Sequence, residues 1–252
     1  MFVLRRLLTR FGYAALGAVY VSLGIVAVRV AFAGARDRVH GFPGAFRFLL
    51  SQKEGPTILA GIAIGLGAFV LARLVDAADP RWTPLGRLFA FFDAVAHAGL
   101  AWIAVALLRR QRAGSFSRPA LAWLVAQRWG PTALETAGLA VVTIGAFQIW
   151  QGVSGGLRRQ LVRRRKLGGV VPFALRVGRF GYTVRGVVTL IIGWFLFRVA
   201  RDADPSKFHE IGGALDVIHH VPLGSALLVI AGLGLVAYGA YLVFLGFFRR
   251  PS

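Results

Sequence analysis

Apolar residues fill six long runs of this chain, and short polar stretches between the runs carry most of the charge. The runs cover residues 11–33, 56–75, 88–108, 131–153, 177–199 and 222–248. Each is about 20 residues or longer, which is the length that an α-helix needs to cross a bilayer core of about 30 Å. The pattern predicts six transmembrane helices and leaves little chain for a soluble domain.

One stretch of sequence occurs twice. The letters "RFGYAALGAVYVSLG" begin at Arg10, and "RFGYTVRGVVTLIIG" begin at Arg179, an offset of 169 residues that holds without a gap through the following helix. A diverged middle copy aligns "AFRFLLSQKEGPT" from Ala45 with "ALAWLVAQRWGPT" from Ala120. Such self-similarity indicates an internal repeat, with copies at 10–75, 87–153 and 176–248. Because its first segment recurs inside the chain, we interpret the N-terminal apolar run as a helix and not as a cleaved signal peptide.

Each repeat consists of a long helix, a short amphipathic segment and a second long helix. Two crossings return the chain to its starting side, so the three repeats share one orientation and imply an axis along the membrane normal. The linkers "AFRFLLSQK" and "ALAWLVAQR" are too short to span and predict interfacial helices on one side of the membrane. We therefore expect an all-α integral membrane protein, one membrane domain over 1–252, with three tandem helix hairpins in a pseudo-threefold arrangement.

The openings of the repeats resemble those of a bacterial membrane family classed as a domain of unknown function, number 1206, which is built of three tandem transmembrane helix pairs. Its R-x-G-Y-x-x-R-G-x-V pattern is matched in full by Arg179, Gly181, Tyr182, Arg185, Gly186 and Val188. The first repeat matches at Arg10, Gly12, Tyr13, Gly17 and Val19, but Leu16 replaces the second arginine. The resemblance covers nearly the whole chain. It implies the architecture above and carries no activity with it.

Glycines recur at seven-residue intervals in several spans, namely Gly17 and Gly24, Gly138, Gly145 and Gly152, Gly186 and Gly193, and Gly232, Gly239 and Gly246. This spacing keeps glycines on one face of a helix. Small residues let helix backbones approach closely where lipid provides no hydrophobic driving force. The pattern predicts tight helix packing, and a glycine-lined pore is the alternative.

The net charge of +20 comes from 30 basic and 10 acidic residues, and nearly all the basic ones are arginine. Since no basic stretch sits on a separate domain, we expect the charge to set membrane orientation and to contact anionic lipids, and we expect no nucleic-acid partner. The loop 154–175 is polybasic and places both termini in the cytoplasm of a bacterial inner membrane. Its candidate headgroup-binding residues are Arg158, Arg159, Arg163, Arg164, Arg165 and Lys166.

Charged residues inside a span are costly and are candidates for function. Asp93 and His97 lie four residues apart and share one face of the third span. Arg185 lies at nearly the same depth in the fifth span, so we expect it to pair with Asp93 beside His97. Glu135 lies one turn into the fourth span, where Arg109 or Arg110 could pair with it. The cluster is interpreted either as a polar clamp that fixes helix register or as a proton or ion path.

Arg29, Arg109 and Arg198 share one position of the repeat, near a span end, and we interpret them as interfacial anchors. The third linker gathers acidic and histidine residues, namely His209, Glu210, Asp216, His219 and His220. They lack the spacing of a recognised zinc site, so we expect solvated polarity, no metal and no cofactor. The chain has no cysteine, which excludes disulfides and thiol catalysis.

No catalytic motif of the common hydrolase, zinc-protease or nucleotide-binding types occurs in the sequence. The leading hypothesis is a non-enzymatic membrane protein with a structural or partner-binding role, whose partner is anionic lipid or another membrane protein. The alternative is a small-solute or proton-linked transporter that uses Asp93, His97 and Arg185. A third hypothesis is a membrane-embedded enzyme that acts on lipid.

Overall fold

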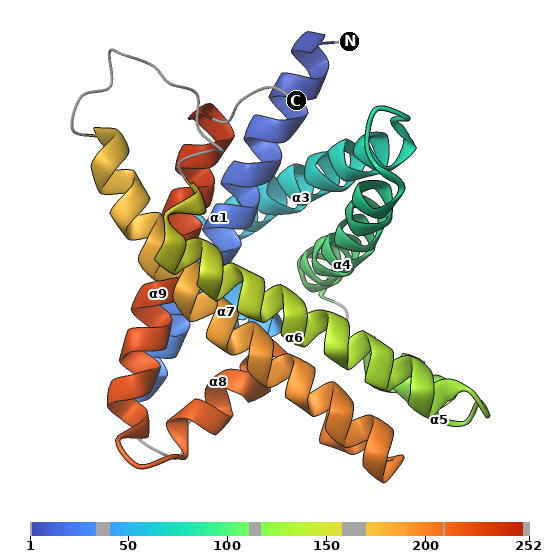
Figure 1. Cartoon of the computed structure of the whole chain (residues 1–252). Coiled ribbons are helices and arrows are strands. Elements are labelled where there is room, and N and C mark those ends of the chain that lie inside the picture. The colour runs from blue at the N-terminus through green and yellow to red at the C-terminus, as the bar shows by residue number, and fades with distance from the viewer. Residues whose placement is uncertain (1, 34–40, 111–116, 158–169, 209, 249–252) are drawn as a thin grey trace.

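The computed structural model describes residues 2–33, 41–110, 117–157, 170–208 and 210–248 of the chain. In these ranges the regular structure is helical throughout (Figure 1). The helices are α1 (Phe2–Ala33), α2 (Gly41–Leu50), α3 (Gly55–Ala78), α4 (Pro84–Leu108), α5 (Ser117–Val125), α6 (Gly130–Ser154), α7 (Val170–Asp202), α8 (Ile211–His219) and α9 (Gly224–Phe248). A short 3₁₀ turn, Pro205–Lys207, precedes α8.

The six predicted spans are confirmed as α1, α3, α4, α6, α7 and α9, each long and apolar enough to cross a membrane. The second helices of the first two repeats begin alike, because Pro56 and Pro131 stand in their first turns. Proline fits there since the amide it lacks has no partner inside the helix. Thr83 caps α4 by accepting a hydrogen bond from the amide of Gly86 at 3.2 Å.

Each repeat packs its second spanning helix against the first spanning helix of the next repeat. The pairs are α3 with α4, α6 with α7 and, closing the cycle, α9 with α1. Glycine seams join the last two pairs. A Cβ atom at Gly186 would lie 2.7 Å from the carbonyl oxygen of Gly145, and one at Gly232 would lie 2.7 Å from that of Gly24. The predicted close packing is thus confirmed, and these glycines line helix contacts.

The pair formed by α3 and α4 lacks these seams. By the repeat offsets, His97 takes the place of Gly17 and Gly186, and Val70 takes the place of Gly239. Gly99, on α4, would place a Cβ atom in open space. Larger side chains at the crossing hold helix backbones further apart than glycines do, so this pair is joined through side chains in place of a glycine seam.

Contacts within a repeat are present in two repeats and missing in one. In repeat 1, Gly65 packs on Ala15, and in repeat 3, Gly234 packs on Val184. The same offsets give Val95 and Ala140 in repeat 2, and both are exposed. Over the described residues, α4 and α6 have at most marginal contact. The ring of six helices is therefore open between α4 and α6, and we call this side of the bundle the open side.

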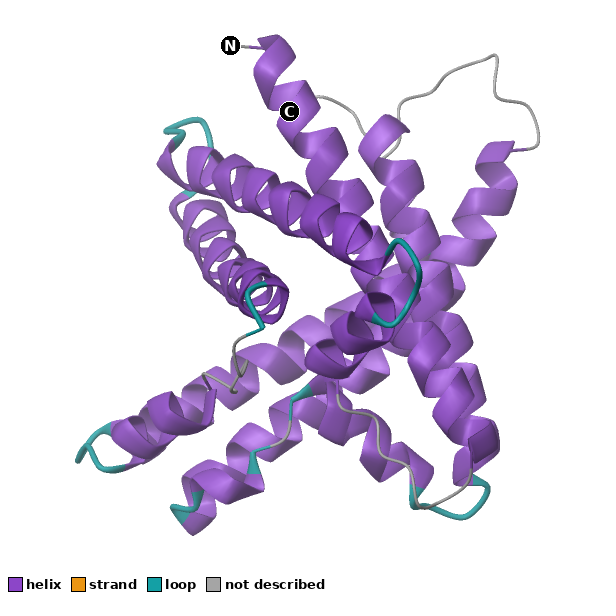
Figure 2. Cartoon of the chain, turned by 180° about the vertical axis from the view of Figure 1, so that it is seen from behind, coloured by secondary structure: helices purple, strands orange, loops and turns teal. Residues whose placement is uncertain are grey.

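Short helices fill all three linkers, as the sequence predicts for the first two. The start of α1 and the end of α9 lie at one end of the molecule, whereas α5 and α8 lie at the other (Figures 1 and 2). Helices α2 and α8 meet closely, because a Cβ atom at Gly41 would lie 3.2 Å from the amide nitrogen of Gly212. The main hydrophobic core lies where α1, α3, α7, α9 and these two linker helices meet.

Candidate functional site

Asp93 and His97 occupy one face of α4, as their spacing predicts. The Nδ1 atom of His97 lies 2.7 Å from the carbonyl oxygen of Asp93 and 3.2 Å from its Oδ1 atom. Since both neighbours of Nδ1 are acceptors, this nitrogen carries the hydrogen, and Nε2 is the position left for a second proton. His97 is buried, and its ring packs against Phe69 of α3.

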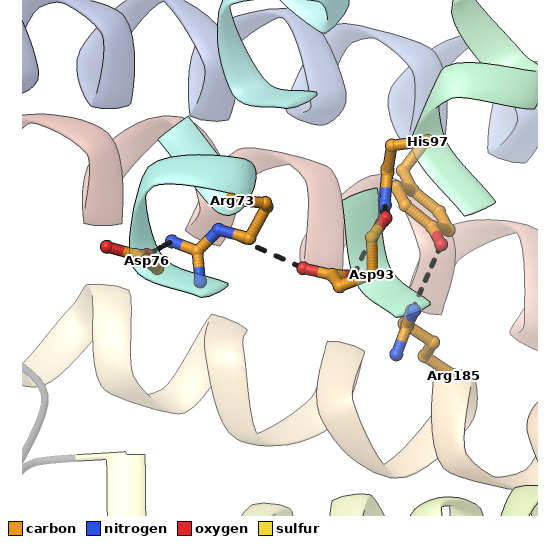
Figure 3. A network of polar contacts seen from close by, with 6 residues as sticks. Arg73, Asp76, Asp93, His97 and Arg185 are labelled. Atoms are coloured by element: carbon orange, nitrogen blue, oxygen red, sulfur yellow. Dashed lines mark hydrogen bonds and ion pairs between the residues drawn. The ribbon is translucent and has the colours of Figure 1, made fainter. Parts of the chain in front are cut away.

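Arg73 of α3 is the cation nearest to Asp93. Its Nε atom lies 4.0 Å from Oδ2 of Asp93, and its Nη2 atom lies 3.1 Å from Oδ2 of Asp76 (Figure 3). Neither Arg73 nor Asp76 was predicted as a site residue, although the charge of Arg73 falls inside a predicted span. Both side chains are buried, so this chain of charges runs from the end of α3 into the bundle.

Arg185 of α7 does not form the predicted ion pair with Asp93. Its Nε atom donates to the hydroxyl of Tyr20 at 3.2 Å, and its guanidinium carbon lies 4.9 Å from the ring centre of Tyr238. Asp93 lies between Arg73 and Arg185 in Figure 3. The prediction was wrong because α4 packs against α3, so the arginine of α3 is within reach of the carboxylate and Arg185 is held by aromatic rings.

All five tyrosines of the chain gather around Arg185 and the helix contacts beside it. The rings of Tyr20 and Tyr182 each pack edge-on against Tyr238, and Tyr182 also packs against Tyr241. Tyr13 packs edge-on against Phe69, the residue that contacts His97. This cluster was not predicted from the sequence. The signal was present, because every tyrosine lies in the first or last repeat and none in the middle one.

The remaining spanning helix, α6, contributes Gln148. Its Oε1 atom lies 3.4 Å from the hydroxyl oxygen of Thr189 of α7, and that hydroxyl donates its hydrogen to the carbonyl oxygen of Arg185 at 2.9 Å. Gln148 stands at the repeat position of Arg73. All six spans thus contribute to two neighbouring groups of polar and aromatic residues, one around Arg73 and Asp93 and one around Arg185. Together we call them the polar belt: Tyr13, Tyr20, Phe69, Arg73, Asp76, Asp93, His97, Gln148, Tyr182, Arg185, Thr189, Tyr238 and Tyr241.

Asp93 is the charged residue of the polar belt that is most open to its surroundings. Its side chain is 41% exposed, whereas that of Arg73 is 11% exposed. Asp93 lies nine residues inside α4, about 14 Å along the helix at 1.5 Å per residue. A carboxylate partly exposed so far into a span is costly in hydrocarbon. The belt therefore presents an uncovered polar group on α4, beside the open side.

The other predicted residues lie apart from the belt. Glu135 is exposed on α6 and forms no ion pair within the described part of the chain, so its predicted pairing with Arg109 or Arg110 is not formed. The three interfacial anchors are exposed near helix ends: Arg29 stacks on the ring of Phe48, Arg198 lies 3.7 Å from Asp202, and Arg109 caps α4. The polybasic residues Arg158, Arg159, Arg163, Arg164, Arg165 and Lys166 lie outside the described residues.

The third linker keeps its polar residues at the end of the bundle that holds α8. Among its described residues, no group of three side chains is placed to hold a metal ion, and His209 is outside them. His219 is buried, and its Nε2 atom lies 3.4 Å from the hydroxyl of Ser225. Before α8, hydrogen bonding by Ser206 lowers the pKa of the Asp204 carboxyl below its usual value.

The fold and the repeats define a class of protein: a multi-pass membrane protein of three helix hairpins. A family profile described as Domain of Unknown Function (DUF1206) matches residues 11–79, 90–155 and 180–249, and the chain belongs to this family. The chain is also similar to "Uncharacterized protein YxxB" of Bacillus subtilis (strain 168), with 28% identity over 96% of this chain and 90% of that protein. No solved structure matches the chain.

Proposed function

We propose that this protein is a non-enzymatic binding protein of the bacterial inner membrane, and that it holds its partner at the open side between α4 and α6. The observation that carries the proposal is the partial exposure of Asp93 deep within α4. A carboxylate in contact with lipid tails is strongly unfavourable, so a partner that covers it with a polar or charged group gains binding free energy there.

The rest of the bundle supports a binding role. Leu23, Leu66 and Leu235 are fully buried where α1, α3 and α9 meet, which favours a packed interior over an open pore. The arginines and carboxylates of the belt engage one another or aromatic rings. Such paired groups hold their geometry, which is what a binding site needs.

The orientation proposed for the protein places both termini in the cytoplasm. The start of α1 and the end of α9 share one end of the molecule (Figure 1). The sequence between α6 and α7 joins helices at this same end and is the most basic of the chain, which favours the cytoplasmic side and contact with anionic lipid. No role in nucleic-acid binding is proposed.

The partner can be detected by purifying the protein in native membrane discs and weighing the intact complexes. We expect a lipid or a second protein to be retained by the unaltered chain and lost from A96W, because Ala96 is exposed one turn from Asp93 on α4. The matched control is A98W, at an exposed alanine on another face of the same helix. Equal retention by both variants would place the partner elsewhere.

Proton-linked transport is the second candidate function, and the row of charges from Asp76 through Arg73 and Asp93 to His97 favours it. These side chains lead from the end of α3 toward the middle of α4, as a proton relay requires. D93N separates the two functions. If Asp93 serves binding and helix register, the variant loses stability or its partner. If it serves a proton path, the variant keeps its fold and loses proton movement in vesicles.

A further inference from the structure

The charges of the polar belt cancel when His97 is neutral. Arg73 and Arg185 supply two positive charges, and Asp76 and Asp93 supply two negative ones. An interior group of charges in a membrane is stable only when it is close to neutral. Any ion that binds in the belt must therefore bring a compensating charge or cause a proton to be gained or lost.

Arg185 is the cation of the belt without a carboxylate partner. Asp93, which lies between Arg73 and Arg185 in Figure 3, makes no ion pair with Arg185 inside 4.0 Å and is engaged by Arg73 and His97. A guanidinium has five N–H donors, and the hydrogen bond from Nε to the hydroxyl of Tyr20 uses one of them. Arginine with free donors is suited to bind a carboxylate through two parallel hydrogen bonds.

We infer that the polar belt binds a single-chain amphiphile with a carboxylate head, a long-chain fatty acid in its anionic form, and that His97 takes up one proton for each molecule bound. This inference rests on the proposed function, because the ligand enters from the bilayer at the open side. Its head lies at Arg185 and its chain lies between α4 and α6, where Phe92 and Phe147 are exposed.

The depth of the site selects this class of ligand. Asp93 lies about 14 Å along α4 from its start, close to half of a bilayer core of about 30 Å. The headgroup of a glycerol-linked phospholipid stays at the membrane surface, whereas a bare carboxylate on one chain is compact enough to lie deeper. A fully water-soluble anion would not favour the apolar walls of the open side.

Proton uptake follows from the charges that face His97. Its own helix presents Asp93, α3 presents Arg73 beside Phe69, α1 presents Tyr13 across Phe69, and α7 presents Arg185 beyond Asp93. When an anion occupies Arg185, that arginine no longer offsets Asp93. A proton on Nε2 makes His97 a cation, which then pairs with Asp93. The loaded belt consists of three neutral pairs: ligand with Arg185, His97 with Asp93, and Arg73 with Asp76.

The test uses hexadecanesulfonate, an amphiphile of the same shape whose head stays ionised at any relevant pH, so that every proton taken up belongs to the protein. Isothermal titration calorimetry on the full chain in lipid discs, in two buffers with different ionisation enthalpies, counts these protons. We expect proton uptake with each bound sulfonate and an affinity that falls as the pH rises. Hexadecanol, which has no charge, should bind at least tenfold more weakly.

Two variants separate the two halves of the inference. R185Q should weaken sulfonate binding at least tenfold. H97Q should bind sulfonate more weakly than the unaltered chain, without proton uptake and without dependence on pH. Glu135→Gln, at an exposed carboxylate outside the belt, is the control and should behave as the unaltered chain. Thermal unfolding in the same discs verifies that each variant is folded.

Sulfonate binding with no proton uptake, or an affinity that R185Q leaves unchanged, would overturn the inference. The proposed function fails on a different result, namely equal retention of the native partner by A96W and A98W. If the native partner is lost from A96W and retained by A98W, but the unaltered chain binds no sulfonate, the fatty-acid inference is wrong and the proposed function stands.

Discussion

At the scale of single residues, two buried tyrosines differ in whether their hydroxyl groups have a hydrogen-bond partner. The hydroxyl of Tyr20 accepts a hydrogen bond from Arg185, whereas the hydroxyl of Tyr241 is buried with no partner among the described residues. Burying a hydroxyl without a hydrogen bond is unfavourable, and removing one partner of an existing bond leaves the other unsatisfied. The same chemical change at the two sites should therefore have opposite effects on stability.

We predict that Tyr20→Phe lowers the free energy of unfolding by about 1–3 kcal/mol, because it leaves a donor of Arg185 unsatisfied. Tyr241→Phe should leave stability unchanged or raise it by about 1 kcal/mol, because an unpaired hydroxyl is removed from the core. Denaturation in detergent micelles under matched conditions measures both. A loss of stability at Tyr241 equal to that at Tyr20 would contradict the assignment of their partners.

Sequence alone predicted the location of Asp93, His97 and Arg185 but not their partners. Their charges and depths can be read from the repeat offsets, whereas partners depend on which helices pack together. The offsets place Asp93 and Arg185 on equivalent helices of two repeats. Two helices can be equivalent in the repeat without packing against each other. Arg73 became the partner of Asp93 because the second helix of repeat 1 packs on the first helix of repeat 2.

At the scale of helices, glycine seams decide how closely each pair packs. The pairs α6 with α7 and α9 with α1 cross at glycines. The carbonyl oxygens of the facing glycines lie so close that a Cβ atom at a seam glycine would overlap them. The seven-residue spacing predicted these packing faces from sequence. It did not predict which two faces pack together, because any glycine face can pack against any other. The linkers and the core residues determine which helices become neighbours.

We predict that Gly186→Ala destabilises the fold by about 1–3 kcal/mol, because its new methyl group would lie 2.6 Å from Ile149 and 2.7 Å from the carbonyl oxygen of Gly145. Gly99→Ala is the matched control, a glycine in another span with open space around its Cβ position, and alanine there has the better helix propensity. Thermal unfolding compares them. Equal melting temperatures for the two variants would mean that the seam is not closely packed.

The middle pair should open before the others. Helices α3 and α4 are joined through His97, Arg73 and Asp93 in place of a glycine seam, and their backbones pack less closely. We predict that amide hydrogens of α4 exchange with solvent deuterium faster than those of α7 in lipid discs. Mass spectrometry of peptides from the two helices measures this, and slower exchange in α4 would contradict the predicted difference.

At the scale of the whole molecule, three similar hairpins form a ring that is not closed. Repeats 1 and 3 pack their own two helices together, and repeat 2 does not. Sequence predicted the hairpins and their threefold relation, and the divergence of repeat 2 marked it as different. The opening itself could not be predicted, since Val95 and Ala140 are ordinary apolar residues whose exposure depends on the position of whole helices.

The open side is the central claim, and cysteine cross-linking tests it most directly because the chain contains no cysteine of its own. Three double variants place cysteines at equivalent positions of the repeats: Ala15 with Gly65, Val95 with Ala140, and Val184 with Gly234. In repeats 1 and 3 the Cβ atoms of each pair would lie closer than the about 3.5–4.5 Å that a disulfide needs, so the two helices must move slightly apart for the bond to form. Under one mild oxidant, we predict that these two pairs form disulfides and that the pair in repeat 2 does not. Equal rates for all three pairs would show a closed ring and contradict the proposed binding site.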